Sequence, residues 1–178
     1  MSISTDKIKE LRDQTGAGIM DCRNALLKAD GDTRKAMDIL KEQSLVRVGK
    51  KSRREASQGL IETYVHTGGR IGAMVELNCE TDFVARTAEF QQLAHDLAMQ
   101  IAAQEPVCIS EEQVPEDTEV DPEIACLMLQ PFIRDPSRTI RDLITETAAR
   151  VGENVRVSRF ARFELGQEES RLAELKAN

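Results

Sequence analysis

The residues best suited to chemistry stand at the end of a strand-like segment. Residues Ile71 to Cys79 alternate between two faces, and the run Glu80-Thr81-Asp82-Phe83-Val84-Ala85 follows at once. Two carboxylates could serve a metal ion, but a metal site needs more oxygen ligands nearby than Glu80 and Asp82 supply. Phe83 either packs into the core, the usual fate of an aromatic residue, or stands out as a hydrophobic wedge flanked by charge. Taken alone, the residue types favour packing.

Other residues with catalytic potential are scattered along the chain. The four cysteines, at positions 22, 79, 108 and 126, form no Cys-x-x-Cys pair, and His66 and His95 are the only histidines. Cys79 lies beside Glu80 with no base adjacent in sequence, so a reduced, buried thiol is expected there. The turn Gly16-Ala17-Gly18 does not follow a strand and therefore lacks the context of a phosphate-binding loop. The sequence predicts a protein that is not an enzyme and uses neither metal nor cofactor.

Charge is distributed unevenly along the chain. The formal net charge is −7, yet the first third is net basic and the rest strongly acidic. Because nucleic-acid affinity comes from neutralising phosphates, nucleic acid is not expected as the main partner. The basic cluster Lys50-Lys51-Ser52-Arg53-Arg54 lacks an aromatic residue for base stacking and indicates a solvated linker, with nonspecific RNA contact as the alternative. The chain has no membrane-spanning apolar run and no signal peptide, which predicts a cytoplasmic protein.

The N-terminal 45 residues carry the signals of three short helices. Ser4 or Thr5 can cap the first, Gly16 can end it, and Asp32 or Thr33 can cap the third. Apolar residues at helical spacing give each helix an inward face. The inward residues are Ile8 and Leu11 in the first helix, Cys22, Ala25, Leu26 and Ala29 in the second, and Ala36, Ile39 and Leu40 in the third.

Ile19 and Met20 open the second of these helices, directly after Gly18. Their spacing favours the start of its buried face. The alternative is that one of them is displayed as a contact point, a role that suits the flexible and polarizable side chain of methionine.

From residue 59 onward the apolar period changes from that of a helix to that of a strand. Gly59 to Val65 and Ile71 to Cys79 predict a hairpin joined by Thr67-Gly68-Gly69-Arg70. Thr87 then caps a helix, with His95 outside its apolar stripe. The stripe comprises Phe90, Leu93, Ala94, Leu97, Ala98 and Ile101.

The remaining elements complete an α+β pattern. Residues 105–123 predict an acidic loop with one helical turn near Ser110, a short helix follows over 122–129, and Thr139 and Gly152 delimit a longer helix. A last strand over 155–165 places Val155, Val157, Arg159, Ala161, Phe163 and Leu165 on one face. We expect an N-terminal three-helix domain (1–45), a basic linker (46–58), a core of antiparallel strands covered by helices (59–165) and a polar tail (166–178).

Three blocks of the sequence resemble translation elongation factor Ts. The first runs from Lys9-Glu10-Leu11-Arg12 through Thr15-Gly16-Ala17-Gly18-Ile19-Met20 to Gly31-Asp32. The second runs from His66 to Ala85 and includes the Asp82-Phe83 pair. The third joins Gly152-Glu153-Asn154 to Arg159-Phe160-x-Arg162-Phe163-Glu164 in the last predicted strand. The blocks occur in family order and at family-like spacing across nearly the whole chain.

This resemblance implies a guanine-nucleotide exchange factor that binds elongation factor Tu and promotes release of GDP. The family has an N-terminal domain that resembles ubiquitin-associated domains and an α+β core, whose Asp-Phe pair is inserted as a wedge near the partner's nucleotide and Mg²⁺ site. The matching partner-binding positions are Thr81, Asp82, Phe83 and Val84 in the core signature, Lys9, Arg12, Ile19 and Met20 in the N-terminal block, and His66 in the core. We interpret Glu80 as a strand-end charge.

The chain departs from the family pattern in two ways. A longer helical insertion, usual between Pro115 and Gln130, is reduced to residues 116–129. The chain also has one copy of the core module, and short members resembling it tend to pair, so a homodimer is expected. Two other functions remain open: a polypeptide-binding adaptor, suggested by the three-helix unit alone, and an enzyme with Cys79 as nucleophile.

Overall fold

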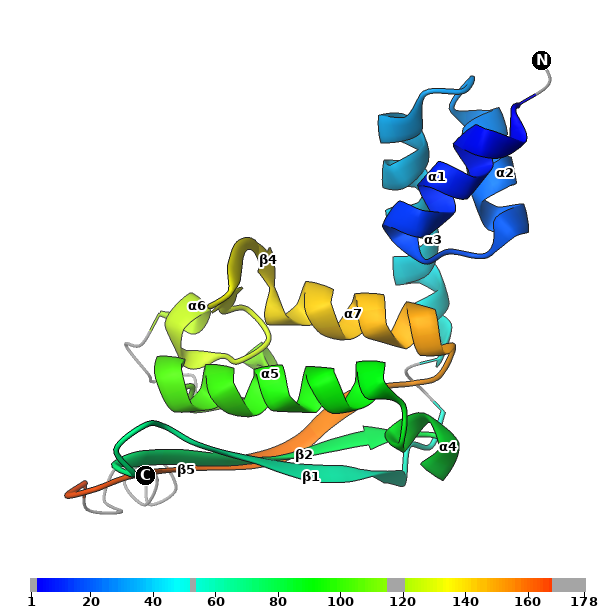
Figure 1. The fold of residues 1–178 in the computed structure, drawn as a ribbon. Coiled ribbons are helices and arrows are strands. Elements are labelled where there is room, and N and C mark those ends of the chain that lie inside the picture. Colours follow the sequence, from blue (N-terminus) through cyan, green and yellow to red (C-terminus); the bar gives the residue numbers. More distant parts are fainter. Residues whose placement is uncertain (1–2, 52–53, 115–120, 168–178) are drawn as a thin grey trace.

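The computed structural model describes residues 3–51, 54–114 and 121–167. It has the expected α+β organisation, with an N-terminal group of helices and a second region in which helices pack on an antiparallel sheet (Figure 1). Parts of three expected segments lie outside these ranges, namely Ser52 and Arg53 of the basic cluster, residues 115–120 of the acidic loop, and residues 168–178 of the tail. Within the described ranges, no helix is long and apolar enough to span a lipid bilayer.

The N-terminal helices have caps of the predicted kind. Helix α1 (Thr5–Thr15) begins at Ser4, whose hydroxyl accepts a first-turn N–H, and ends at Gly16 in the left-handed conformation. Helix α2 (Ile19–Lys28) follows. Asp32 Oδ1 accepts the N–H groups of Arg34 and Lys35 at the start of α3 (Thr33–Lys51). Helix α3 is longer than expected, because it continues past residue 45 into the segment predicted as a linker.

The three helices enclose a small core of their own and rest on one helix of the second region. Their buried residues are Leu11, Cys22, Ala25, Leu26, Ala29, Ala36 and Leu40, all predicted to face inward. Helix α3 packs against α7 (Ile140–Val151). A Cβ atom at Gly16 would lie 3.5 Å from Cγ of Arg150, so the loop after α1 touches the last turn of α7.

The sheet has the order β1–β2–β5 and is antiparallel throughout. Strands β1 (Gln58–Val65) and β2 (Ile71–Cys79) form the predicted hairpin, and β5 (Arg156–Glu164) pairs with the other edge of β2. One face of β2 is buried against α5 (Ala88–Gln104), which lies across the sheet (Figure 1). All six residues of the predicted α5 stripe are buried.

A bulge in β5 overturns the predicted orientation of the last strand. Leu77 pairs with Val157 and Glu76 with Arg159, so Ser158 is an extra residue, and its hydroxyl bonds to Asn78 Oδ1. One inserted residue reverses the alternation, since the side-chain period of a strand is two. Val155 and Val157 are buried as expected, but the other four residues of the predicted face, Arg159, Ala161, Phe163 and Leu165, lie on the exposed side of the sheet.

The connection between α5 and α7 contains structure that periodicity did not predict. The 3₁₀ helix η1 (Glu111–Gln113) was expected as a helical turn, whereas α6 (Pro122–Ala125) is shorter than the helix predicted over 122–129. A small hairpin of β3 (Pro131–Phe132) and β4 (Asp135–Thr139) follows. The fully buried Gln100 of α5 fixes it: Nε2 donates to Gln130 Oε1 and Pro131 O, and Oε1 accepts from Ile133 N. Gln100 and Gln130, with their hydrogen bonds satisfied, therefore hold this hairpin to α5 where apolar side chains would otherwise pack.

Helix α7 begins with the capping box predicted at Thr139 and Asp142. Thr139 Oγ1 accepts from Asp142 N at 3.2 Å, and Asp142 Oδ2 accepts from Thr139 N at 3.1 Å. Burial opposes the ionisation of Asp142, but the hydrogen bonds from Thr139 and the charge of Lys41 outweigh it, so the pKa of Asp142 is lowered from 3.8. Thr139 of the cap and Lys41 of α3 thus both favour the ionised form of the Asp142 carboxylate.

We expect Asp142→Asn, which keeps the side-chain shape and removes the charge, to lower the free energy of unfolding by about 1 kcal/mol near neutral pH. Because the folded-state pKa of Asp142 is lowered, this contribution is present above the unfolded-state value of 3.8 and is lost as pH falls through the folded-state pKa. Urea unfolding at neutral pH and at about pH 3 measures the difference in free energy of unfolding between the variant and the unmodified chain. Asp13→Asn, at an exposed position, is the control. An equal loss of stability at both pH values would contradict the conclusion that the ionised carboxylate of Asp142 stabilises the fold.

Candidate partner-binding site

The wedge residues form a single helical turn at one end of the sheet. Helix α4 (Asp82–Ala85) begins shortly after β2, and its cap Thr81 accepts Val84 N at 3.4 Å. Val84 and Ala85 are buried, whereas Phe83 is 78% exposed. Asp82 pairs with Arg86 in solvent. The packing interpretation of Phe83 is therefore wrong, since the ring stands outside the core while its neighbours anchor the turn.

The base of this turn is bonded to the segment between α7 and β5. Glu153 Oε2 accepts the N–H groups of Glu80 and Thr81, both at 3.0 Å, and Glu153 Oε1 accepts the Thr81 hydroxyl at 2.7 Å. In return Glu80 Oε1 accepts Asn154 N at 2.7 Å. Glu80 is therefore more than a strand-end charge. Sequence reasoning missed both carboxylates, although Glu153-Asn154 stands in the third motif block.

The N-terminal candidates lie on the surface of the three-helix unit. Lys9 and Arg12 are exposed on α1, and Ile19 and Met20 are 55% and 57% exposed in the first turn of α2. The favoured prediction that Ile19 and Met20 begin a buried face is wrong, because burial begins at Cys22. The pKa of Cys22 is raised by burial, and the nearby charge of Arg12 opposes that shift.

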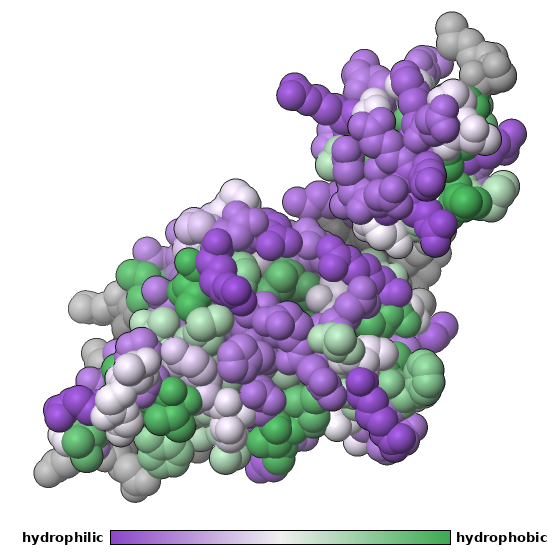
Figure 2. All heavy atoms as spheres, viewed as in Figure 1, coloured by the Kyte–Doolittle hydropathy of each residue, from purple (hydrophilic) through white to green (hydrophobic). Residues whose placement is uncertain are grey.

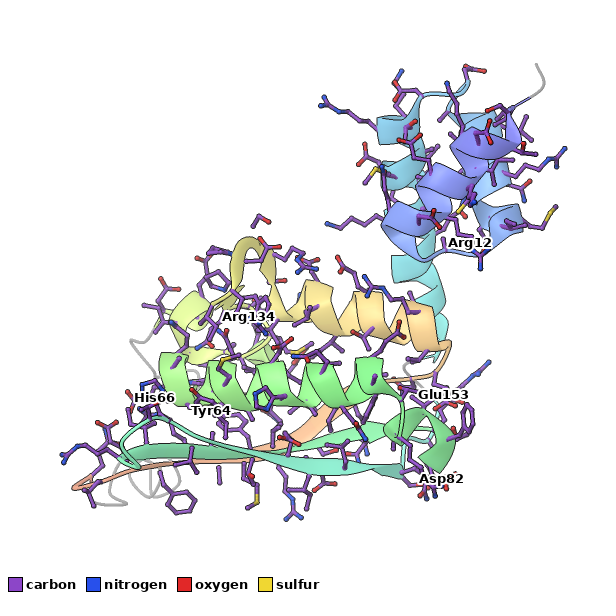
Figure 3. The ribbon with its side chains drawn as sticks, viewed as in Figure 1. Arg12, Tyr64, His66, Asp82, Arg134 and Glu153 are labelled. Atoms are coloured by element: carbon purple, nitrogen blue, oxygen red, sulfur yellow. The ribbon has the colours of Figure 1, made fainter. Side chains whose placement is uncertain are left out.

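Both groups of candidates adjoin the C-terminal end of α7. The loop after α1 touches Arg150, and Glu153 follows the last turn of α7 and holds the base of α4. Figure 3 shows Arg12 and Asp82 at the same end of the molecule, with Glu153 between their elements. Two surfaces distant in sequence are therefore presented on one side.

His66 lies apart from these residues. It follows β1 at the hairpin end of the sheet, where its Nδ1 is 3.1 Å from Tyr64 Oη, whereas α4 follows the opposite end of β2 (Figure 3). A strand of the nine residues of β2 spans about 27 Å. The structure therefore does not bring His66 together with Asp82 and Phe83.

The cysteines lack the surroundings of a nucleophile. Burial raises the pKa of Cys79, and the charge of Glu153 raises it further. Burial also raises the pKa of Cys108 to about 12, helped by Cys126, whose Sγ is 3.1 Å away. A thiol is nucleophilic as its thiolate, so raised pKa values argue against the Cys79 enzyme. Among the described residues, no group of three or more His, Cys, Asp or Glu could hold a metal ion.

Comparisons with known proteins point to one family. The family model described as "Elongation factor TS" matches residues 28–121. The chain is 46% identical to the "Elongation factor Ts" of Caldanaerobacter subterraneus subsp. tengcongensis, over 93% of this chain and 98% of that protein. It is 44% identical to the protein of that name from Carboxydothermus hydrogenoformans, over 93% and 90%. It is 45% identical to the one from Thermodesulfovibrio yellowstonii, over 94% and 98%.

The exposure of Phe83 makes a clear prediction about stability. We expect Phe83→Ala to change the free energy of unfolding by less than about 0.5 kcal/mol, as for other surface substitutions. The matched control Phe90→Ala removes a fully buried ring from α5 and should cost about 3–5 kcal/mol. Denaturant unfolding of both variants measures the two values. A similar loss for both would restore the packing interpretation.

Proposed function

This chain belongs to the elongation factor Ts family, and we propose that it is a guanine-nucleotide exchange factor for elongation factor Tu. The three motif blocks predicted the family, and the comparisons confirm it. In our proposal Asp82 and Phe83 enter the partner near its nucleotide and Mg²⁺ site and promote the release of GDP. The observation that carries this proposal is the Phe83 ring, 78% exposed on a turn whose other side is anchored in the core.

The proposed mechanism is displacement, and this chain makes or breaks no bond. Mg²⁺ requires near-octahedral ligands at about 2.0–2.1 Å, so a small shift of the surrounding protein weakens a nucleotide held through it. Because protein interiors are close-packed, a ring driven between helices moves them by a discrete step. By linkage, GDP must weaken binding of the factor by the same ratio in which the factor weakens GDP. Incoming nucleotide can therefore dissolve the complex.

The three-helix unit would supply a separate grip on the same partner. Lys9 and Arg12 offer exposed charge on α1, and Ile19 and Met20 offer exposed apolar side chains in the first turn of α2. Apolar residues surrounded by charge are typical of protein contact sites. The division into residues 1–45, 46–58 and 59–165 stays part of this proposal, although α3 extends to Lys51. Thr81 and His66 remain proposed contacts, whereas the buried Val84 would support the turn from beneath. A polypeptide-binding adaptor, by contrast, would leave α4 without a role.

We also propose that the protein forms a homodimer through the outer face of its sheet. That face carries the exposed side chains of Ile61, Val65, Met74, Phe163 and Leu165, each between 45% and 67% exposed. Figure 2 shows apolar residues along the lower edge of the molecule, where the sheet lies. Monomers seldom expose contiguous apolar patches of this kind. A second copy related by a two-fold axis would cover each sheet with the other.

Release of fluorescent GDP from elongation factor Tu tests the exchange function. We expect the chain to accelerate release in the presence of excess unlabelled GDP. Phe83→Ala should lower the maximal acceleration by roughly tenfold or more, because the ring acts only in the displaced state. Met20→Ala should raise the half-maximal concentration about tenfold and largely keep the maximal rate, as expected of a contact that contributes only affinity.

The control variant is Ile124→Ala, an apolar residue on α6 whose exposed fraction of 63% lies between those of Met20 (57%) and Phe83 (78%). It should leave both parameters unchanged. If the unmodified chain does not accelerate release, the proposed function is wrong. If Phe83→Ala retains full acceleration, exchange stands and the wedge does not.

Light scattering at micromolar concentration tests the dimer. We expect a mass of twice the 19.9 kDa of one chain, and a single-chain mass for Phe163→Lys, which places a charge on the outer face. Ile124→Lys adds the same charge elsewhere and should remain dimeric. A single-chain mass for the unmodified protein would contradict the homodimer.

A further inference from the structure

Glu153 connects the end of α7 to the wedge turn. Helix α7 ends at Gly152, whose φ of 76° is in the left-handed region that favours glycine, and Glu153 comes next. Its carboxylate accepts three hydrogen bonds, all from Glu80 and Thr81, the residues just before α4. Hydrogen bonds to an ionised acceptor are stronger than those between neutral groups. The end of one helix thus fixes the residues that start another.

The bonding is reciprocal and includes the segment that enters the sheet. Glu80 Oε1 accepts Asn154 N at 2.7 Å, while Glu80 Oε2 lies 3.4 Å from Arg54 Nη1. Asn154 Nδ2 donates to Arg54 O at 2.8 Å. Three segments far apart in sequence therefore meet at the base of α4. Rotation of the turn would break several of these bonds together.

Thr81 transmits this constraint to Phe83. Its Oγ1 donates to Glu153 Oε1 and also accepts Val84 N, so one hydroxyl joins the carboxylate to the turn. Cys79 Sγ donates to Thr81 O at 3.1 Å, which restrains the same residue from the strand side. The direction in which Phe83 projects is then set by the position of Glu153.

We infer that Glu153 is a positioning residue for nucleotide exchange, whose carboxylate holds α4 in the orientation that points Phe83 at the partner. This inference rests on the proposed function. A ring on a turn that can swing yields when it meets a packed surface, whereas a ring on a fixed turn displaces that surface. Glu153 bonds to Glu80 and Thr81, not to Phe83 itself, and so acts on the ring through Thr81.

A role confined to folding would predict something different. Loss of Glu153 would then lower stability and reduce activity by the same factor whether or not Phe83 is present. A positioning role predicts that the effect depends on Phe83, because the carboxylate acts only through the ring that it orients. The charge should also matter, since an amide at this position has one acceptor oxygen for three donors.

Fluorescence anisotropy tests the positioning without any exchange assay. The chain contains no tryptophan, so Phe83→Trp introduces a single indole at the tip of the turn. Adding Glu153→Ala should lower the anisotropy of this indole in the isolated protein. The control is Glu146→Ala, also on α7. It removes the ion pair of Glu146 with Arg138 of β4, which is separate from the hydrogen bonds of Glu153, and should leave the anisotropy unchanged. An unchanged value with Glu153→Ala overturns the inference.

The exchange assay then tests whether the orientation matters for function. Glu153→Ala should lower the maximal GDP release rate by roughly tenfold, the change that loss of one charge-assisted hydrogen bond produces, with Glu153→Gln between it and the unmodified chain. The half-maximal concentration should change little, because the three-helix unit is untouched. In a Phe83→Ala background, Glu153→Ala should lower the rate no further.

The outcomes separate the two proposals. An equal reduction by Glu153→Ala in both backgrounds would mean a structural role only and overturn the inference. If the unmodified chain fails to accelerate GDP release, the proposed exchange function falls, and with it the functional part of this inference. A lower anisotropy together with an unchanged release rate would show that Glu153 orders the turn without positioning it for exchange, and this also overturns the inference.

Discussion

The hydrogen bonds from Glu80 and Thr81 to Glu153 are the constraint on which the site depends. Folding back onto apolar surface would lower the free energy of an exposed phenylalanine ring. A four-residue turn also has little helical stability of its own. Two anchors oppose that collapse: Val84 and Ala85 are buried beneath the turn, and the carboxylate holds its base. The carboxylate is itself located by α7, which packs against α5. The exposed position of the Phe83 ring therefore depends on the packing of the core beneath it.

The extra residue Ser158 plays a comparable part for the sheet. It lets Val157 face the helices near one end of β5 while Phe160 and Arg162 face them further along, where Arg162 Nε donates to Ala102 O at 3.1 Å. With unbroken alternation Phe163 would turn toward α5 and Phe160 away from it. One bulge therefore decides which apolar side chains build the core and which remain on the outer face.

Local signals predicted much of this fold, and non-local pairing accounts for what they missed. The caps at Ser4, Thr87 and Thr139 and the stripe of α5 follow from neighbouring residues alone, so the sequence predicted them. The bulge depends on how β5 pairs with β2, which no single segment encodes. Ile19 and Met20 were misread because helical spacing does not reveal where a packing partner ends. At the candidate site, the motif pointed to the exposed Phe83, but the hydrogen bond of Glu80 depends on Asn154, 74 positions away.

The proposed separation of the contacts made by the three-helix unit from the wedge formed by Asp82 and Phe83 has a thermodynamic reason. An exchange factor must bind its partner well enough to form a complex, yet bind the nucleotide-free form better than the GDP form, since only differential affinity shifts an equilibrium. A contact of the kind proposed for Met20 would bind both forms and add affinity without displacement. In the proposed mechanism Phe83 supplies the difference, because its ring would fit only the displaced partner. Both proposed surfaces adjoin the C-terminal end of α7, since the loop after α1 lies beside Arg150 and Glu153 follows the helix and bonds to the base of α4. On the proposed mechanism, contacts of the three-helix unit would keep Phe83 close to the nucleotide site, and incoming nucleotide would act against the contact made by Phe83.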